Sequence, residues 1–119
     1  DHMGARAREQ SSGLILKMIK KINHRSLPII LMGDFNSIPD SPPVNKIKTD
    51  LSDALHISLK ELQGPRGTFN GFNADLPIEK RIDYIFTGNF KVLSYIHIND
   101  RLNNNRHISD HLPVMVKIQ

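Results

Sequence analysis

The chain has 119 residues, 39% of them hydrophobic and 24% charged, which is typical of one folded domain and excludes a disordered segment. It contains no cysteine, so disulfides, thiolate zinc sites and a cysteine nucleophile are excluded, and no apolar run is long enough to predict a transmembrane segment. The formal net charge of +4 suits an anionic partner such as nucleic acid or a phosphate ester, although a solvated basic face of one helix is the preferred explanation for it.

Residues 5–22 are predicted to form a helix, because apolar side chains recur there at helical spacing and most basic side chains fall off that stripe. The stripe consists of Leu14, Ile15, Met18, Ile19 and Ile22. Residues 27–32 form a short continuous apolar run, which predicts a buried strand that ends at Gly33. Ser41 followed by two prolines is typical of a helix start, and this second helix is expected to end near Lys48.

The second half of the chain is predicted to consist mostly of loops and strands. Residues 51–73 carry few periodic signals and several turn residues, so they are expected to be mostly loop. Three strands follow, with a turn after the first and a polar loop after the second; they are predicted at residues 81–86, 91–98 and 112–118. This order of elements predicts an α+β fold in which a helix packs on a largely antiparallel sheet.

The segment GDFN brings an acid and an amide to the end of the predicted buried strand, where sheet-based active sites commonly lie. Asp34 could accept a proton from water, and Asn36 could hold a phosphate oxygen through its NH2 group. A turn that ends a strand favours the same residue types, so this segment alone leaves the structural and the catalytic interpretation open.

Two later segments place acids and a histidine on strands. Asp83 lies in the middle of the predicted strand 81–86, where an unpaired carboxylate is disfavoured, so a partner such as a protonated histidine is expected. Asp110 and His111 precede the last strand, and because neighbours on a strand point to opposite faces, they are expected to have different roles. The alternatives are an edge strand with Asp83 in water and a turn with a surface histidine.

The loop segment GTFNGF, residues 67–72, contains two aromatic side chains and two glycines. Phe69 and Phe72 could form an apolar wall beside a substrate, and we assign Phe69 and Asn70 as candidate substrate-binding residues. A loop that its phenylalanines anchor to the core is at least as good an explanation.

The segments GDFNSIPDS, GTFNGF, RIDYIF and SDHLPV, in this order, resemble the C-terminal half of the endonuclease/exonuclease/phosphatase family, and the form with GTFNGF is most similar to its small bacterial members. The family includes deoxyribonucleases, deadenylases, neutral sphingomyelinases and inositol polyphosphate phosphatases. The resemblance implies half of a four-layer α/β/β/α sandwich over residues 1–119. It also implies a hydrolase that uses Mg²⁺, with Mn²⁺ as the alternative, to cleave a phosphodiester or phosphomonoester.

The resemblance implies a role for each matching residue. Asp34 would activate or position the attacking water, and Asn36 would orient the scissile phosphate. Asp83 would hold the imidazole of His111, and the cationic His111 would bind the phosphate. Asp110 would lie at or near the metal.

The resemblance covers only the C-terminal half of the family, whose main magnesium ligand is a glutamate of the other half. We therefore expect this chain alone to have little activity and an exposed sheet face, which a missing N-terminal half or self-association would cover. Asp1 and His2 lie in the matching text DHMG and are further candidate site residues. One alternative is a non-catalytic binding module that retains the half-sandwich. Another is a different metallophosphoesterase fold, which would need more histidine and aspartate ligands at strand ends.

Overall fold

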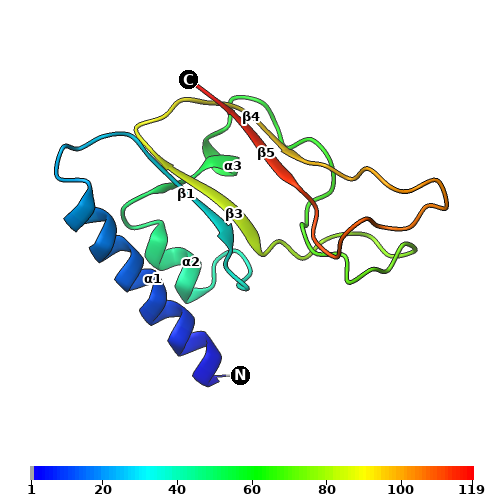
Figure 1. The fold of residues 1–119 in the computed structure, drawn as a ribbon, viewed down its shortest axis with the longest axis horizontal. Helices are drawn as coiled ribbons and strands as arrows, with labels where there is room; N and C mark the ends of the chain where they lie inside the picture. Colours follow the sequence, from blue (N-terminus) through cyan, green and yellow to red (C-terminus); the bar gives the residue numbers. More distant parts are fainter. Residues whose placement is uncertain (1) are drawn as a thin grey trace.

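The computed structural model describes residues 2–119 and shows an α+β fold over that range (Figure 1). In chain order the elements are α1 (His2–Ile22), β1 (Ile29–Asp34), α2 (Pro42–Ile47), β2 (Ser52–Asp53), α3 (Ala54–Ile57), β3 (Asp83–Gly88), β4 (Val92–His97) and β5 (Val114–Ile118). The predicted fold class is confirmed, and each predicted helix and strand is present with shifted ends. The candidate Asp1 lies outside the described residues, and His2 is the first residue of α1.

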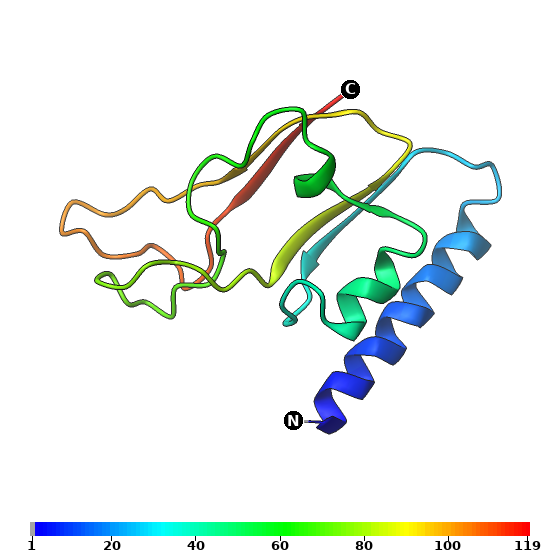
Figure 2. The same cartoon turned by 180° about the vertical axis from the view of Figure 1, so that it is seen from behind.

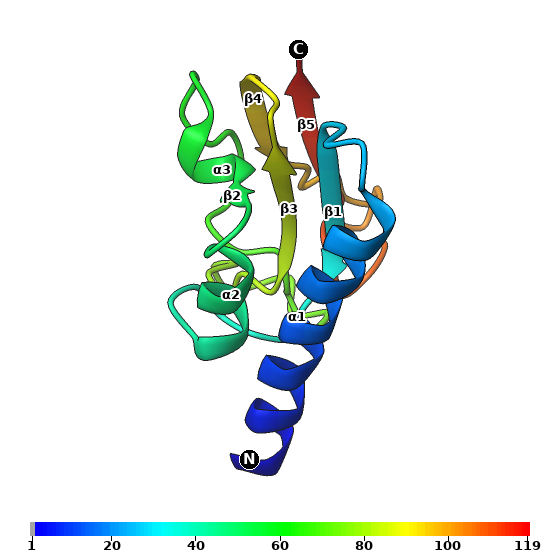
Figure 3. The ribbon, with the colours of Figure 1, turned by 90° about the vertical axis from the view of Figure 1, so that its left-hand side faces the viewer.

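The strands form two antiparallel sheets within the described range. β3 is the centre of a three-stranded sheet with the order β1–β3–β2, and β4 pairs with β5. The turn predicted after the first of the three later strands therefore leads from one sheet to the other, and Asn89 adopts the positive φ of 62° that this turn requires. Helices α1 and α2 lie on one side of the three-stranded sheet, and β4 and β5 lie on the other (Figures 1 and 3).

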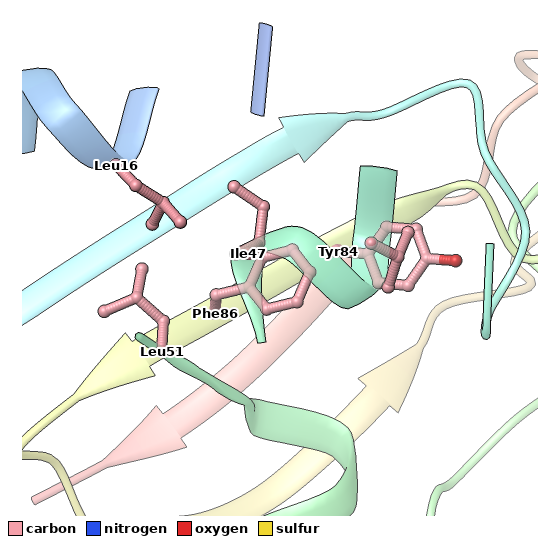
Figure 4. Close-up of a cluster of buried hydrophobic side chains, with 6 residues drawn as sticks. Leu16, Ile47, Leu51, Tyr84 and Phe86 are labelled. Atoms are coloured by element: carbon pink, nitrogen blue, oxygen red, sulfur yellow. The ribbon is translucent and has the colours of Figure 1, made fainter. Parts of the chain in front are cut away.

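One hydrophobic core lies between the helices and the three-stranded sheet. Leu16 of α1, Ile47 of α2 and the nearby Leu51 pack against Tyr84 and Phe86 of β3 (Figure 4). Because side chains alternate along a strand, these two aromatic residues point to the helices, and their neighbours on β3 point to the other sheet. The rings of Tyr84 and Phe86 stack with their centroids 5.4 Å apart.

The buried face of α1 differs from the predicted stripe. Leu14, Met18 and Ile22 are exposed by 60%, 42% and 70%, whereas Ile15 and Ile19 pack against the core as predicted. The helix carries two adjacent apolar stripes, and only the one that contains Leu16 meets the sheet. Composition alone does not distinguish the two stripes, so the stripe prediction was wrong for three of its five residues.

A second core lies between the two sheets, where Ile85 of β3 packs with Val92 and Tyr95 of β4. The same face of β1 is not covered within the described residues, because Ile30 is exposed by 46% and Met32 by 68%. This confirms the prediction that one face of the apolar strand is uncovered. None of the helices in residues 2–119 is long and apolar enough to cross a membrane.

The region predicted as loop at residues 51–73 contains two short elements, β2 and α3, which the sequence does not indicate because they have only two and four residues. Asp53 joins them and accepts two hydrogen bonds of 2.7 Å from the guanidinium of Arg81. The side chains of this ion pair are only 1% and 5% exposed. Figure 3 shows α3 beside β2. The predicted loop therefore adds an edge strand to the three-stranded sheet, and Ala54 of α3 packs with Val92 and Tyr95 of β4.

Candidate active site

The candidate site begins with two carboxylates at the same end of the three-stranded sheet. Asp34 is the last residue of β1 and Asp83 the first residue of β3, and antiparallel pairing places them directly opposite each other. The prediction that Asp83 lies in the middle of its strand is therefore wrong, because the pairing of β3 starts at this residue. Residues opposite each other point to the same face, and like charges in this arrangement repel.

His111, from the segment before β5, contacts both carboxylates. Its Nδ1–H donates to Oδ2 of Asp83 over 2.8 Å, since a carboxylate can only accept, and its Nε2 lies 4.0 Å from Oδ2 of Asp34. The hydrogen bond with Asp83 is the main cause that raises the pKa of His111; partial burial opposes it, and the charges of Asp83, Asp34 and Asp110 add to it. The predicted contact between Asp83 and His111 is confirmed, as is the proximity of Asp34 to His111.

Asn36 and Asp110 adjoin this group through backbone contacts. The backbone N–H of Asn36 donates to Oδ1 of Asp34 over 2.7 Å, and its positive φ of 47° is typical of the turn that follows β1. The backbone carbonyl of Asp110 accepts a hydrogen bond of 2.8 Å from the N–H of Asn70. Asp110 is half-buried, and its carboxylate is one of the charges that favour the cationic form of His111.

The loop at residues 67–72 packs against the histidine. The ring of Phe69 meets the imidazole of His111 edge-on at 5.4 Å. The side-chain amide of Asn70 is hydrogen-bonded to the backbone. Its Nδ2 donates to the carbonyl of Ser109 over 2.9 Å, and its Oδ1 accepts from the N–H of Phe72 over 2.7 Å. These contacts give Asn70 a role in holding two loops together. The two loops lie side by side at one end of the molecule (Figures 1 and 2).

This arrangement of segments matches a known family model. Residues 5–111 match the model described as the endonuclease/exonuclease/phosphatase family. The chain belongs to this family. Its members are hydrolases and include phosphoesterases, and they generally depend on a divalent metal. Among the curated proteins, none is similar enough to count as a match.

Several solved structures resemble the chain closely. A conserved protein of unknown function from Enterococcus faecalis has 28% identity and a TM-score of 0.88, and the match covers 100% of this chain and 46% of that protein. A mannosyl-6-phosphatase from Bacteroides thetaiotaomicron has 32% identity and a TM-score of 0.87, with 100% and 48% covered. A family protein from Leptotrichia buccalis has 28% identity and a TM-score of 0.66, with 87% and 41% covered. The chain therefore spans about half the length of the solved structures it matches.

The side chains at the strand ends suit the divalent metal on which the endonuclease/exonuclease/phosphatase family generally depends. Asp34, Asp83 and His111 offer ligand atoms that all lie within 4.8 Å of one another. Asp83 is bonded to the imidazole, and the raised pKa of His111 favours its cation, which cannot bind a metal. The side chain of Asp34 is 46% exposed, so its carboxylate is the oxygen ligand most available in this group. Mg²⁺ sites commonly use one or two carboxylates and keep several waters.

Two hollows adjoin the pair of strand ends. A cleft of about 210 Å³ is lined by Asp34 and Asp83 together with Met32, Leu112 and Val114. A cavity of about 430 Å³ is lined by His111; its lining also includes Ile98, Ile108 and Pro113.

Sequence reasoning missed Ser109, which supports the histidine. Its Oγ accepts the backbone N–H of His111 over 3.2 Å, and its carbonyl accepts from Asn70. The available signal is a serine two residues before a candidate site residue, because serine side chains often accept the N–H two positions later.

Proposed function

We propose that the chain carries the phosphate-binding half of a metal-dependent phosphoester hydrolase. The observation that supports this proposal is the imidazole of His111, held between the carboxylates of Asp83 and Asp34 at distances of 2.8 and 4.0 Å. A cationic imidazole fixed by a carboxylate is suited to bind a phosphate oxygen and to stabilise charge that develops on it. The same proposal assigns residues 1–119 as the C-terminal half of the family domain.

Each residue has a defined task in this mechanism. Asp83 keeps Nδ1 of His111 protonated. The other ring nitrogen, Nε2, then donates its hydrogen to a phosphate oxygen. Asp34 positions the attacking water, while the N–H of Asn36 holds one carboxylate oxygen in place. The amide of Asn36 orients the phosphate. Positioning of this kind supplies much of the rate enhancement in phosphoryl transfer.

The proposed metal is Mg²⁺, with Mn²⁺ as the alternative. Asp34 would hold it, and Asp110 is the second carboxylate that we assign to it. When bound, such an ion neutralises phosphate charge and lowers the pKa of bound water. The described residues supply few protein ligands of their own, which agrees with an ion that retains waters.

The proposed substrate is a phosphate ester, and sugar phosphates are the first class to test. The Bacteroides thetaiotaomicron relative is a mannosyl-6-phosphatase, so the scaffold supports hydrolysis of a phosphomonoester in that protein. The net charge of +4 is compatible with nucleic acid as an alternative substrate. Phe69 remains our candidate for the wall beside the substrate, because it already packs on His111.

We further propose that activity requires a second half of the domain, which the solved relatives contain and to which this chain does not align. The chain covers 46 to 48% of two of them. Ile30 and Met32 form an exposed apolar face next to Asp34, so another protein surface is expected to cover that face. The chain alone is expected to turn over phosphate esters poorly.

Reconstitution tests the proposal directly. The chain is fused behind the N-terminal half of the Bacteroides thetaiotaomicron relative, and hydrolysis of sugar phosphates and of a phosphodiester is measured with Mg²⁺, with Mn²⁺ and with chelator. We expect metal-dependent hydrolysis that His111→Ala and Asp34→Asn each reduce by about a hundredfold or more. A folded fusion that hydrolyses none of these esters, or one whose activity survives both substitutions, would contradict the proposal and favour a binding module.

A further inference from the structure

The loop segment GTFNGF contains a threonine that the candidate site does not use chemically. Thr68 is fully buried, with a relative exposure of 0%, although its side chain is polar. It stands between the strand end that carries Asp83 and the segment that carries His111. A buried polar residue needs hydrogen-bond partners. The hydroxyl of Thr68 has its partners at the start of β3, and its carbonyl has its partner in the segment that carries His111.

The hydroxyl of Thr68 holds the start of β3. Its Oγ1 accepts the backbone N–H groups of Ile82 and Asp83, each over 3.1 Å. These two donors lie at the point where β3 begins, so they fix the direction in which the strand presents its first side chain. The N–H of Thr68 also donates to the carbonyl of Lys80 over 2.9 Å, which ties the segment before the strand to the same residue.

The carbonyl of Thr68 holds the other partner of the ion pair. It accepts the N–H of Leu112 over 2.7 Å, and Leu112 follows His111 directly. The next residue, Phe69, forms an isolated β-bridge with His111 and packs on its ring. One residue thus bonds both segments whose side chains must meet.

The glycine before it permits this close approach. A side chain on Gly67 would place its Cβ only 2.5 Å from the backbone carbonyl carbon of Glu79 and the backbone nitrogen of Lys80. Those atoms are backbone and cannot move aside without shifting the segment that leads to Asp83. The pair Gly67 and Thr68 therefore combines close backbone contact with a hydroxyl acceptor.

We propose that Thr68 is a positioning residue that sets the separation of Asp83 and His111 by bonding the backbone of both segments. It touches neither substrate nor metal in this role. The position of the two side chains is a property of this chain, and only its catalytic consequence rests on the proposed function.

The test compares Thr68→Val, which keeps the shape and removes the acceptor, with Thr68→Ser, which keeps the hydroxyl. Thr87→Val is the matched control, because Thr87 is also a buried threonine, lies on β3, and its hydroxyl has no hydrogen-bond partner among the described residues. The readout is the imidazole Nδ1–H resonance of His111 in the 119-residue chain, observed by nuclear magnetic resonance at fixed pH without metal.

We expect the wild type, Thr68→Ser and Thr87→Val to show a slowly exchanging, downfield Nδ1–H signal, and Thr68→Val to lose it or to exchange it about tenfold faster. If Thr68→Val does not fold, hydrogen exchange of the backbone amides tests the proposal instead. The amides of Ile82 and Asp83 should then be protected from exchange equally in the wild type and in Thr68→Ser. A folded Thr68→Val with the wild-type signal, or amides of Ile82 and Asp83 that exchange like exposed ones, would overturn the proposal.

The two proposals fail in different ways. Loss of the Nδ1–H signal in Thr68→Val with an inactive wild-type fusion would leave the positioning role standing and remove the hydrolase. In an active fusion, Thr68→Val should lower kcat and change KM little, and Thr68→Ser should restore kcat.

Discussion

Removal of Arg81 should destabilise the chain strongly, because it leaves a buried charge without its partner. The guanidinium donates two hydrogen bonds of 2.7 Å to Asp53, and its carbon lies 4.4 Å from the ring centroid of Tyr84 and 5.6 Å from that of Tyr95. In Arg81→Met the carboxylate of Asp53 keeps the N–H of Leu55 at 3.1 Å as its main remaining partner. Neither side chain of the ion pair is more than 5% exposed, so water cannot substitute.

The expected loss is about 3–5 kcal/mol, the usual cost of removing one member of a buried ion pair. A domain of this size has a total stability of roughly 6–18 kcal/mol, so the substitution removes a large share of it. With an m-value of about 2 kcal/mol per molar urea, the unfolding midpoint should fall by about 1.5–2.5 M. The measurement is urea unfolding followed by circular dichroism.

The double variant Asp53→Asn/Arg81→Met separates the ion pair from ordinary packing. The asparagine keeps an acceptor for the N–H of Leu55 and removes the buried charge. We expect the double variant to be less destabilised than the sum of the two single variants by more than about 1 kcal/mol. Additive losses, or a loss below about 1 kcal/mol for Arg81→Met alone, would refute the argument that the two side chains stabilise the fold as a coupled ion pair.

Four further predictions concern the site and its surroundings. The hydrogen bond with Asp83 and the nearby carboxylates raise the pKa of His111 in the folded chain. The stabilisation that protonated His111 provides is therefore complete below its ordinary pKa of 6.5 and is lost as the pH rises through the raised pKa. The urea midpoints of the wild type and of His111→Gln should accordingly differ less at high pH. Asp34→Asn should abolish any rise in melting temperature that Mg²⁺ or Mn²⁺ produces, and a rise that persists would place the ion elsewhere. Met32→Lys should reduce any self-association seen by light scattering, and an unchanged mass would exclude this face as the contact. Asn70→Ala should cost about 1–3 kcal/mol in urea unfolding, because it removes both bonds to the loop backbone; a loss below about 0.5 kcal/mol would show that the loops do not depend on it.

The sequence predicted the charged group of the site because its logic is local. The partner of Asp83 was predicted from a carboxylate in the middle of a strand; Asp83 lies instead at the start of β3, but its contact with His111 is confirmed. Asp34 joined them because β1 and β3 pair with their site ends in register. The fold class followed from the order of the elements.

The parts that sequence reasoning missed depend on contacts between distant segments. Asp53 and Arg81, which form the buried ion pair, are 28 residues apart in the sequence. The sequence around each residue does not indicate that the other will be its partner. Thr68 is equally unremarkable in sequence, because its partners are backbone groups and any chain position offers those. For α1, the choice between two apolar stripes depended on where the sheet lay.

The segments that build the site come together from far along the chain, which has a consequence for the order of folding. Asp83 and His111 are separated by 28 residues, and Asn70 and Ser109 by 39. During synthesis β1 and β3 leave the ribosome before His111 does, so the three-stranded sheet can assemble while Asp34 and Asp83 still lack the imidazole between them. The end of the molecule that carries these side chains would then be the last part to form.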